Sequence, residues 1–401
     1  MVGLHEQFCF TLHFSLFAAF WMLIAKTFYF FFFAAGAFLS PFLVLYYESL
    51  GFSGYHIGIL TGLPPLVSMV SSPAWSGMAD AFRRHKMVLM LTLGGAIGAV
   101  ALLSVTSSFV LLLPVIGLFA FFMAPVIPLS DNAVLEVLGE RRSEYGRQRI
   151  WGAVGWGISA VAAGWATQHY GLHWSFYGYI LLMSTCWLVM TRLPMGEEVS
   201  LQSSFFKSFR LLMRNPQWRV LILTVFIVEI SRAIVRNFLF LHLNDLNAGR
   251  DLMGWSLMFA TLGELPVFFF AERMLKSWGP RGLLTFSIAA SVIQALLFSM
   301  IGATWLVLPF QLLHGPAFSA GHVARINYAR EVAPPGLGAT AQGILASVGM
   351  GLAGSSGALI GGVLYDAVGA PTAFRIAAGL AFMGLCFFRL KSSPVGISSK
   401  A

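Results

Sequence analysis

Charged residues and cysteines are both scarce in this sequence of 401 residues. Only 10% of the residues are Asp, Glu, Lys or Arg, whereas 58% are hydrophobic. A soluble chain could not bury so much apolar surface, so this balance excludes an ordinary soluble protein and makes the bilayer the solvent. The three cysteines, Cys9, Cys186 and Cys386, all fall inside apolar stretches, which excludes a disulfide framework and a cysteine metal cluster.

Catalytic signatures are missing as well. No HExxH spacing, Walker loop, dinucleotide glycine pattern or Ser/His/Asp order stands out, so we expect no enzyme activity, no cofactor and no metal site. An alternative stays open, because His314 and His322 lie eight residues apart and, with Glu264, would supply ligands for an intramembrane metalloenzyme.

Apolar runs of about 20 residues, the length that crosses a bilayer, recur along the whole chain. We place about twelve of them, near residues 27–46, 56–78, 87–106, 109–131, 149–167, 174–191, 219–241, 253–271, 282–300, 303–324, 339–362 and 372–389. The longest polar break separates the first six from the last six. The sequence therefore predicts an all-α polytopic membrane protein with an N-terminal extension (1–25), a six-helix half (26–192), a cytoplasmic linker (193–218), a second six-helix half (219–390) and a cytoplasmic tail (391–401).

The basic residues indicate the orientation of this bundle. The formal net charge is +9, and loop cations such as Arg83, Arg141 and Arg281 fall on one side, whereas the other side has little beyond Arg250. This asymmetry is typical of cytoplasmic loops rather than of a nucleic-acid surface. We therefore expect the bundle to lie in a cell membrane, with both of its ends on the cytoplasmic side. The segment before Phe8 has no Lys or Arg, and we expect Met22 to be the physiological start.

Several ionisable residues interrupt the apolar runs. Glu229, Arg232 and Arg236 share one face of a predicted helix, and Glu264 and His314 lie in later runs. An ionisable residue at the bilayer centre costs about 2.5 to 3.5 kcal/mol, so these residues are expected to line a polar pathway. The pattern predicts a monomeric carrier for a small solute, bound between helices.

The two predicted halves echo each other at Asp80 with Arg84 and at Glu272 with Lys276, where an acid precedes a base by four residues. Such a repeat is typical of a carrier built from two parallel halves, and we interpret these residues as a gating motif. The alternative is that they are helix-end charges that face the cytoplasm and the helix dipole.

The loop that contains the first of these pairs, GMADAFRRHK, resembles the signature loop of the major facilitator superfamily. The stretch from Asp131 to Trp156 resembles the lactose permease branch, and TLGELPVF and LLHGPAF are similar to its eighth and tenth helices. This resemblance implies alternating access and the branch of proton-coupled permeases for oligosaccharides, nucleosides and phenylpropionate-type acids.

The resemblance also implies a solute site. It places Asp131 where sugar permeases have a carboxylate, Arg149 where they have its arginine partner and Trp156 where an aromatic ring stacks on the sugar. Glu264 and His314 match a binding carboxylate and a histidine. The alternative for Asp131 and Arg149 is a structural ion pair at the membrane interface.

The sequence departs from this branch at its coupling residues. Gln311 and Ala317 stand where sugar permeases have a lysine and a proton-carrying glutamate, and Ser76 and Arg83 replace glycines of the signature loop. We therefore assign proton coupling first to Glu264, which is expected to meet the charged face of the preceding helix.

Glu229, the two arginines of the same helix and the function itself each have more than one interpretation. Glu229 is the second candidate for proton coupling, with a structural salt bridge as its alternative. An anionic substrate paired with Arg232 or Arg236 would equally explain the arginines, and a receptor or scaffold of the same fold is a third function.

Glycines and phenylalanines in the apolar runs predict how the helices pack. Gly94 with Gly98, and Gly357 with Gly361, have the spacing that lets helices approach closely. The phenylalanine run from Phe30 to Phe33 is interpreted as lipid-facing.

Overall fold

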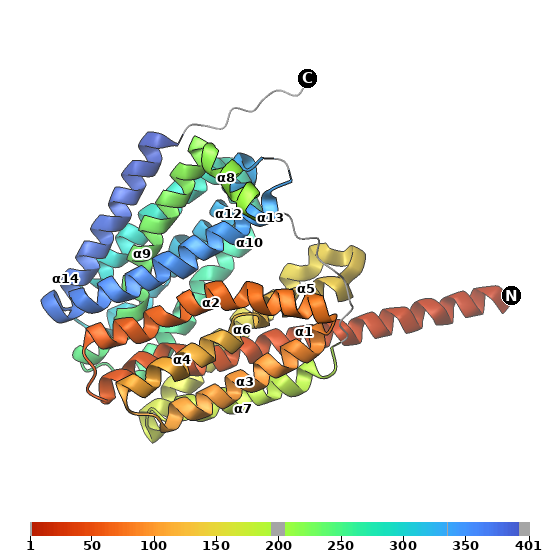
Figure 1. The fold of residues 1–401 in the computed structure, drawn as a ribbon, viewed down its shortest axis with the longest axis horizontal. Coiled ribbons are helices and arrows are strands. Elements are labelled where there is room, and N and C mark those ends of the chain that lie inside the picture. Colours follow the sequence, from red (N-terminus) through yellow and green to blue (C-terminus); the bar gives the residue numbers. More distant parts are fainter. Residues whose placement is uncertain (1, 194–204, 335, 393–401) are drawn as a thin grey trace. The chain divides into compact units, whose positions relative to one another are not determined.

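The computed structural model describes residues 2–193, 205–334 and 336–392 (Figure 1). Part of the predicted linker, residues 194–204, lies outside the described residues, as does the predicted tail from residue 393 onwards. The described part is helical and contains no strand, which confirms the all-α prediction.

The helices follow one another with short connections. They are α1 (Val2–Ser49), α2 (Gly54–Phe82), α3 (His85–Val105), α4 (Phe109–Met123), α5 (Val126–Leu138), α6 (Tyr145–Tyr170), α7 (Trp174–Met190), α8 (Phe205–Arg214), α9 (Pro216–Asp245), α10 (Arg250–Phe298), α11 (Val307–Gln311), α12 (Ala320–Val332), α13 (Gly338–Ala346) and α14 (Gly354–Lys391). Between them lie the 3₁₀ turns η1 (Gly139–Glu144) and η2 (Thr304–Leu306) and the π-helical turns η3 (Gly315–Ser319) and η4 (Ser347–Ala353).

Two of the longest helices are broken by a glycine. Gly279 in α10 and Gly369 in α14 have φ values of 63° and 74°, a backbone conformation that interrupts a right-handed helix and that glycine adopts without strain. Each of these helices therefore supplies two crossings. With α4 and α5 counted as one segment and η2 to α12 as another, the described residues hold twelve spans, as the sequence predicted.

Length and composition alone identify fewer crossings. In the described part of the chain, six helices are long and apolar enough to span a membrane, among them Arg250–Phe298 and Thr340–Lys391, which contain the two breaks. The remaining segments include α6 and α9, which carry Arg149 and Glu229 of the candidate site.

The chain forms two compact units. The first comprises residues 1–40 and 70–200, and the second comprises residues 41–69 and 201–401, so the boundary falls inside α1 and inside α2. Residues 41–69 cluster with the second unit because the start of α2 packs on α14. There, a Cβ atom added to Gly58 would lie 2.6 Å from the carbonyl oxygen of Ala358, and Asp366 accepts hydrogen bonds from the main-chain N–H groups of Gly54 (2.6 Å) and Tyr55 (2.8 Å).

In the first unit the phenylalanine run packs inward. Phe32 is 8% exposed, and the ring of Phe33 lies where a Cβ atom of Gly152 on α6 would be. The expectation that this run faces lipid is wrong for these two residues. For Phe33 the reason is that Gly152 of α6 leaves room for its ring.

In the second unit α9 and α14 pack along each other (Figure 1). A Cβ atom at Gly357 would lie 2.6 Å from the Ala233 Cβ and from the Ile230 carbonyl oxygen, and one at Gly361 would lie 2.7 Å from the Phe238 ring. This confirms the predicted close approach at Gly357 and Gly361. The same prediction is wrong for Gly98 in the first unit, because no atom lies within 4 Å of a Cβ atom added there.

Candidate functional site

The first polar cluster joins α1, α5 and α6 of the first unit. Arg149 on α6 donates from Nη1 to both carboxylate oxygens of Asp131 on α5, at 2.8 and 3.0 Å. Tyr29 on α1 donates its hydroxyl to Asp131 at 2.7 Å. Side chains of three helices thus meet at this carboxylate, and helical residues supply its hydrogen bonds.

Aromatic rings surround the guanidinium of this pair. The Arg149 guanidinium lies 5.7 Å from the centre of the Tyr29 ring and 5.6 Å from that of Phe33, a separation at which a cation is attracted to the ring face. Arg149 also donates to the Tyr145 hydroxyl at 3.2 Å. The side chains of Arg149 and Asp131 remain 36% and 24% exposed, so the pair is accessible on one side.

Trp156 lies seven residues after Arg149 on α6, which places both on the same helical face. It is half-buried, and a Cβ atom at Gly36 on α1 would lie 3.3 Å from its ring. The structure therefore brings Asp131 and Arg149 into contact and sets Trp156 two turns farther along the same helix.

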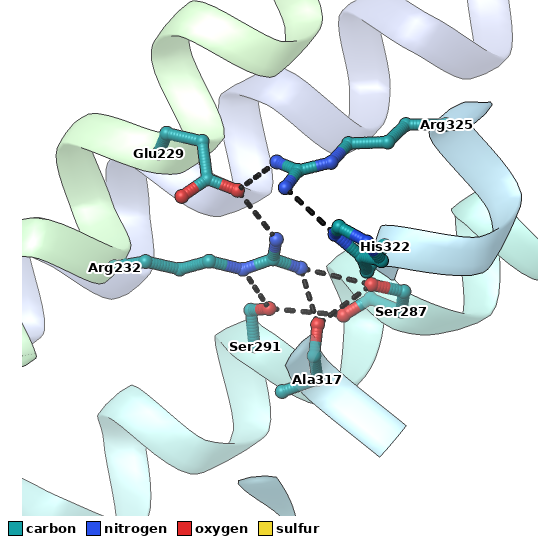
Figure 2. A network of polar contacts seen from close by, with 7 residues as sticks. All are labelled: Glu229, Arg232, Ser287, Ser291, Ala317, His322 and Arg325. Carbon is teal, nitrogen blue, oxygen red and sulfur yellow. Dashed lines mark hydrogen bonds and ion pairs between the residues drawn. The ribbon is translucent and has the colours of Figure 1, made fainter. Parts of the chain in front are cut away.

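The second polar cluster lies in the second unit and centres on Glu229 (Figure 2). One oxygen of this carboxylate, Oε1, accepts from Arg232 at 2.9 Å and from Arg325 on α12 at 3.0 Å. The side chain of Glu229 is only 7% exposed, and those of Arg232 and Arg325 are 14% and 13% exposed. Glu229 is thus a buried carboxylate shared by two guanidiniums.

Arg232 uses all three of its nitrogens. Besides Glu229, it donates from Nε to Ser291 at 3.0 Å, and from Nη2 to Ser287 at 2.8 Å and to the main-chain carbonyl of Ala317 (Figure 2). The carbonyl belongs to the π-helical turn η3, which lies between α11 and α12. Arg232 therefore connects α9 to α10 and to this turn. A small cavity beside this network, lined in part by Thr224 and Gly321, is too small for an organic solute.

Arg325 was missed by the sequence reasoning. It comes directly after the predicted end of a span at residue 324, where a cation resembles an ordinary loop residue. Its spacing of three from His322 was the available signal, because Arg325 donates from Nη2 to His322 Nδ1 at 3.1 Å. Ser287, Ser291, Tyr29 and Tyr145 carried no comparable signal.

Glu264 on α10 pairs with a different partner from the one expected. Its Oε1 lies 3.4 Å from Nε2 of His314, with side-chain exposures of 20% and 34%, whereas the hydrogen bonds to Glu229 come from Arg232 and Arg325. The close approach of Gly315 to the main chain of Gly263 brings these two helices together at this point.

The histidines of this region do not converge on one point. His314 stacks on Phe318 with ring centres 5.2 Å apart, and Phe318 in turn stacks towards His322 at 6.2 Å. Among the residues that the structure describes, no group of three or more His, Cys, Asp or Glu side chains is arranged to hold a metal ion.

Arg236 lies one helical turn beyond Arg232 on α9. Its side chain is exposed. Within the described part of the chain, no hydrogen bond or ion pair engages its guanidinium.

The residues of the predicted gating motif differ between the two units. Asp80 bonds to His85 at 2.8 Å, while Arg84 directs Nη1 to the Met87 sulfur at 3.8 Å. In the second unit, Lys276 and Glu272 form an ion pair at 2.6 Å and are 76% and 81% exposed. Their spacing in the sequence is the same, but their partners are not.

Comparison with known proteins identifies the family. Residues 20–376 match the MFS_1 like family. The chain belongs to this family of the major facilitator superfamily. As a member of it, the chain is a multi-pass membrane transporter, which confirms the resemblance found in the sequence.

Individual relatives of this MFS_1-like transporter carry different substrate names. It is 27% identical over 363 residues to the "Maltose permease" of Geobacillus stearothermophilus, covering 90% of each chain. It is 23% identical to the "Probable 3-phenylpropionic acid transporter" of Escherichia coli (strain K12), covering 76% of this chain and 81% of the relative. A crystal structure of a mutant of the nucleoside transporter NupG shares the fold, with a TM-score of 0.81, 19% identity and coverage of 93% of this chain and 100% of that structure.

Proposed function

We propose that this MFS_1-like transporter takes up a small organic solute together with a proton by alternating access, with Glu264 as the group that carries the proton. The solute classes that its relatives suggest are sugars, nucleosides and aromatic acids. The observation that carries the proposal is the contact between Glu264 and His314, two groups that can each gain or lose a proton, at 3.4 Å and partly exposed.

Protonation of Glu229 and protonation of Glu264 would affect the neighbouring groups differently. A proton on Glu229 would remove the counter-charge of two buried guanidiniums, and breaking a buried ion pair in this way costs about 3–5 kcal/mol. A proton on Glu264 would leave only a histidine, which can be neutral. Glu264 is therefore the better proton carrier, and Glu229 is a structural ion-pair partner.

Asp131, Arg149 and Trp156 form the proposed solute site of the first unit. A carboxylate and a guanidinium with remaining exposure can share the hydroxyl groups of one solute, and an indole suits the apolar face of a sugar or a base. In the second unit, His314 and Glu264 would bind the solute directly, with Arg232 and Arg236 supplying positive charge. Asp80, Arg84, Glu272 and Lys276 would act at the gate.

The cations of the loops support the orientation that we propose for the transporter in the membrane. Cations such as Arg83 and Arg281 gather in loops of one side, so we place both ends of the bundle in the cytoplasm and treat the monomer as the working unit.

The proposal is tested in proteoliposomes that contain an internal pH dye. Addition of solute should acidify the lumen of vesicles with wild-type protein, and Glu264→Gln should abolish this proton movement while the protein stays folded. Glu331→Gln, which changes an exposed glutamate elsewhere, is the matched control. Proton movement that survives Glu264→Gln would remove this residue from the mechanism.

The solute site is tested with the same preparations. Arg149→Ala should weaken solute binding far more than it lowers the yield of folded protein. Equal losses of binding and yield would instead favour a structural ion pair between Arg149 and Asp131.

A further inference from the structure

Within the polar interior of the second unit, the positive and negative groups are not equal in number. Three guanidiniums, those of Arg232, Arg236 and Arg325, accompany two carboxylates, those of Glu229 and Glu264. Glu229 serves two of the arginines, and Glu264 faces His314. One guanidinium therefore lacks a carboxylate of its own.

The hydrogen bonds decide which arginine this is. Arg232 is held by Glu229, Ser287, Ser291 and the Ala317 carbonyl, and it has no free nitrogen. Arg325 is held by Glu229 and His322. Arg236 alone among the three is exposed, and within the described residues its guanidinium makes no hydrogen bond or ion pair.

Arg236 lies at a depth in the membrane where an unpaired charge is costly. Helix α9 has 30 residues, and Arg236 lies about 8 Å along the axis from its centre, inside the span of a bilayer core of about 30 Å. A charge at this depth is rare unless it lines a wet cavity or meets a partner. A planar guanidinium with its donors free is suited to a carboxylate, which it can bind through two parallel hydrogen bonds.

The neighbourhood of Arg236 indicates what the rest of the ligand resembles. Arg232, one turn before Arg236, contacts the turn η3 through the Ala317 carbonyl, and this turn contains Phe318 and directly follows His314. His314 is 34% exposed and stacks on the half-buried ring of Phe318, with the two planes 14° apart. Flat π surfaces of this kind suit an apolar or aromatic body more than a fully hydroxylated one.

We infer that Arg236 binds the carboxylate of an organic anion, so that the solute of this transporter is a small monocarboxylic acid with an apolar body rather than a neutral sugar or nucleoside. The inference rests on the proposed transport function and narrows its solute class. It also assigns different roles to two arginines on one helix face, because Arg232 then positions Glu229 whereas Arg236 binds the solute.

The test compares two probes of the same shape, 3-phenylpropionate and its neutral amide, by isothermal titration calorimetry on the purified full-length protein. Hydrogen bonds to charged groups contribute enough that the wild type should bind the acid at least about tenfold more tightly than the amide. Arg236→Gln should abolish this preference, and Arg236→Lys should retain part of it. Arg375→Gln, at another exposed arginine, is the matched control.

The outcomes are distinguishable. Equal binding of acid and amide by the wild type, or a preference for the acid that survives Arg236→Gln, would overturn the inference while leaving transport intact. Tight binding of maltose or uridine without the acid would do the same. An Arg236-dependent stabilisation by phosphatidylglycerol, but not by the acid, would assign the site to a lipid phosphate and overturn it. Acid binding that depends on Arg236 without proton movement would support the inference and refute proton coupling.

Discussion

The Glu229 network offers the sharpest test of how charge is held inside the second unit. Glu229→Gln preserves the shape of the side chain but leaves the guanidiniums of Arg232 and Arg325 without the carboxylate that both contact at about 3 Å. Removing one partner of a buried ion pair destabilises a protein by about 3–5 kcal/mol. Arg325→Gln should destabilise less, by about 1–3 kcal/mol, because Glu229 keeps Arg232.

The double variant Glu229→Gln with Arg325→Gln removes one charge of each sign. It should therefore be less destabilised than the sum of the two single variants, by about 1 to 3 kcal/mol, as expected for residues in one network. Unfolding can be followed in mixed micelles of increasing SDS content through the fluorescence of the chain's 11 tryptophans.

The exposed pair of Glu272 and Lys276 provides the matched control. Both side chains face outward, so Glu272→Gln should not measurably change the unfolding midpoint. If Glu229→Gln were as mild as this control, or if the single effects simply added, then the two arginines would not depend on Glu229 and the reasoning would fail.

Two further predictions concern the backbone. Arg83 directly follows α2 and has φ of 51°, a conformation that costs a non-glycine residue about 1 kcal/mol or more. Arg83→Gly should therefore stabilise the protein by about 1 kcal/mol, whereas Arg84→Gly, at φ of −128°, should not. Equal effects of the two variants in SDS unfolding would contradict this. Gly357→Ala should destabilise the protein by about 1–3 kcal/mol because its Cβ atom would meet the α9 backbone. Gly98→Ala, whose Cβ atom would have no atom within 4 Å, should be neutral or should stabilise the protein by up to about 1 kcal/mol. Destabilisation by both variants to the same extent would argue against the close contact at Gly357.

Much of the fold was predictable because hydrophobic length is a local property. Each predicted span overlaps a helical segment of the described structure, including the two pairs that are joined into α10 and α14. The inward packing of Phe33 was not predictable, because it depends on Gly152 of α6, more than a hundred residues away in the chain.

The candidate site was predicted only in part for a similar reason. The contact between Asp131 and Arg149, and that between Glu264 and His314, join residues that the sequence had singled out. Arg325 lies 96 residues from Glu229, and no periodicity along one helix can indicate a partner on another. The hydrogen bonds of Tyr29, Ser287 and Ser291 depend in the same way on how the helices are packed together.

The π-helical turn η3 has a consequence for everything that follows it in the chain. Its wide coil, in which the N–H of Ala320 donates to the carbonyl of Gly315, accommodates one more residue than a regular turn. Since each residue of an α-helix advances about 100°, His322 and Arg325 are rotated by roughly that angle from where an unbroken helix after His314 would carry them. Deleting a single residue here would swing Arg325 away from Glu229, so the surplus residue sets the register on which the whole ion-pair network depends.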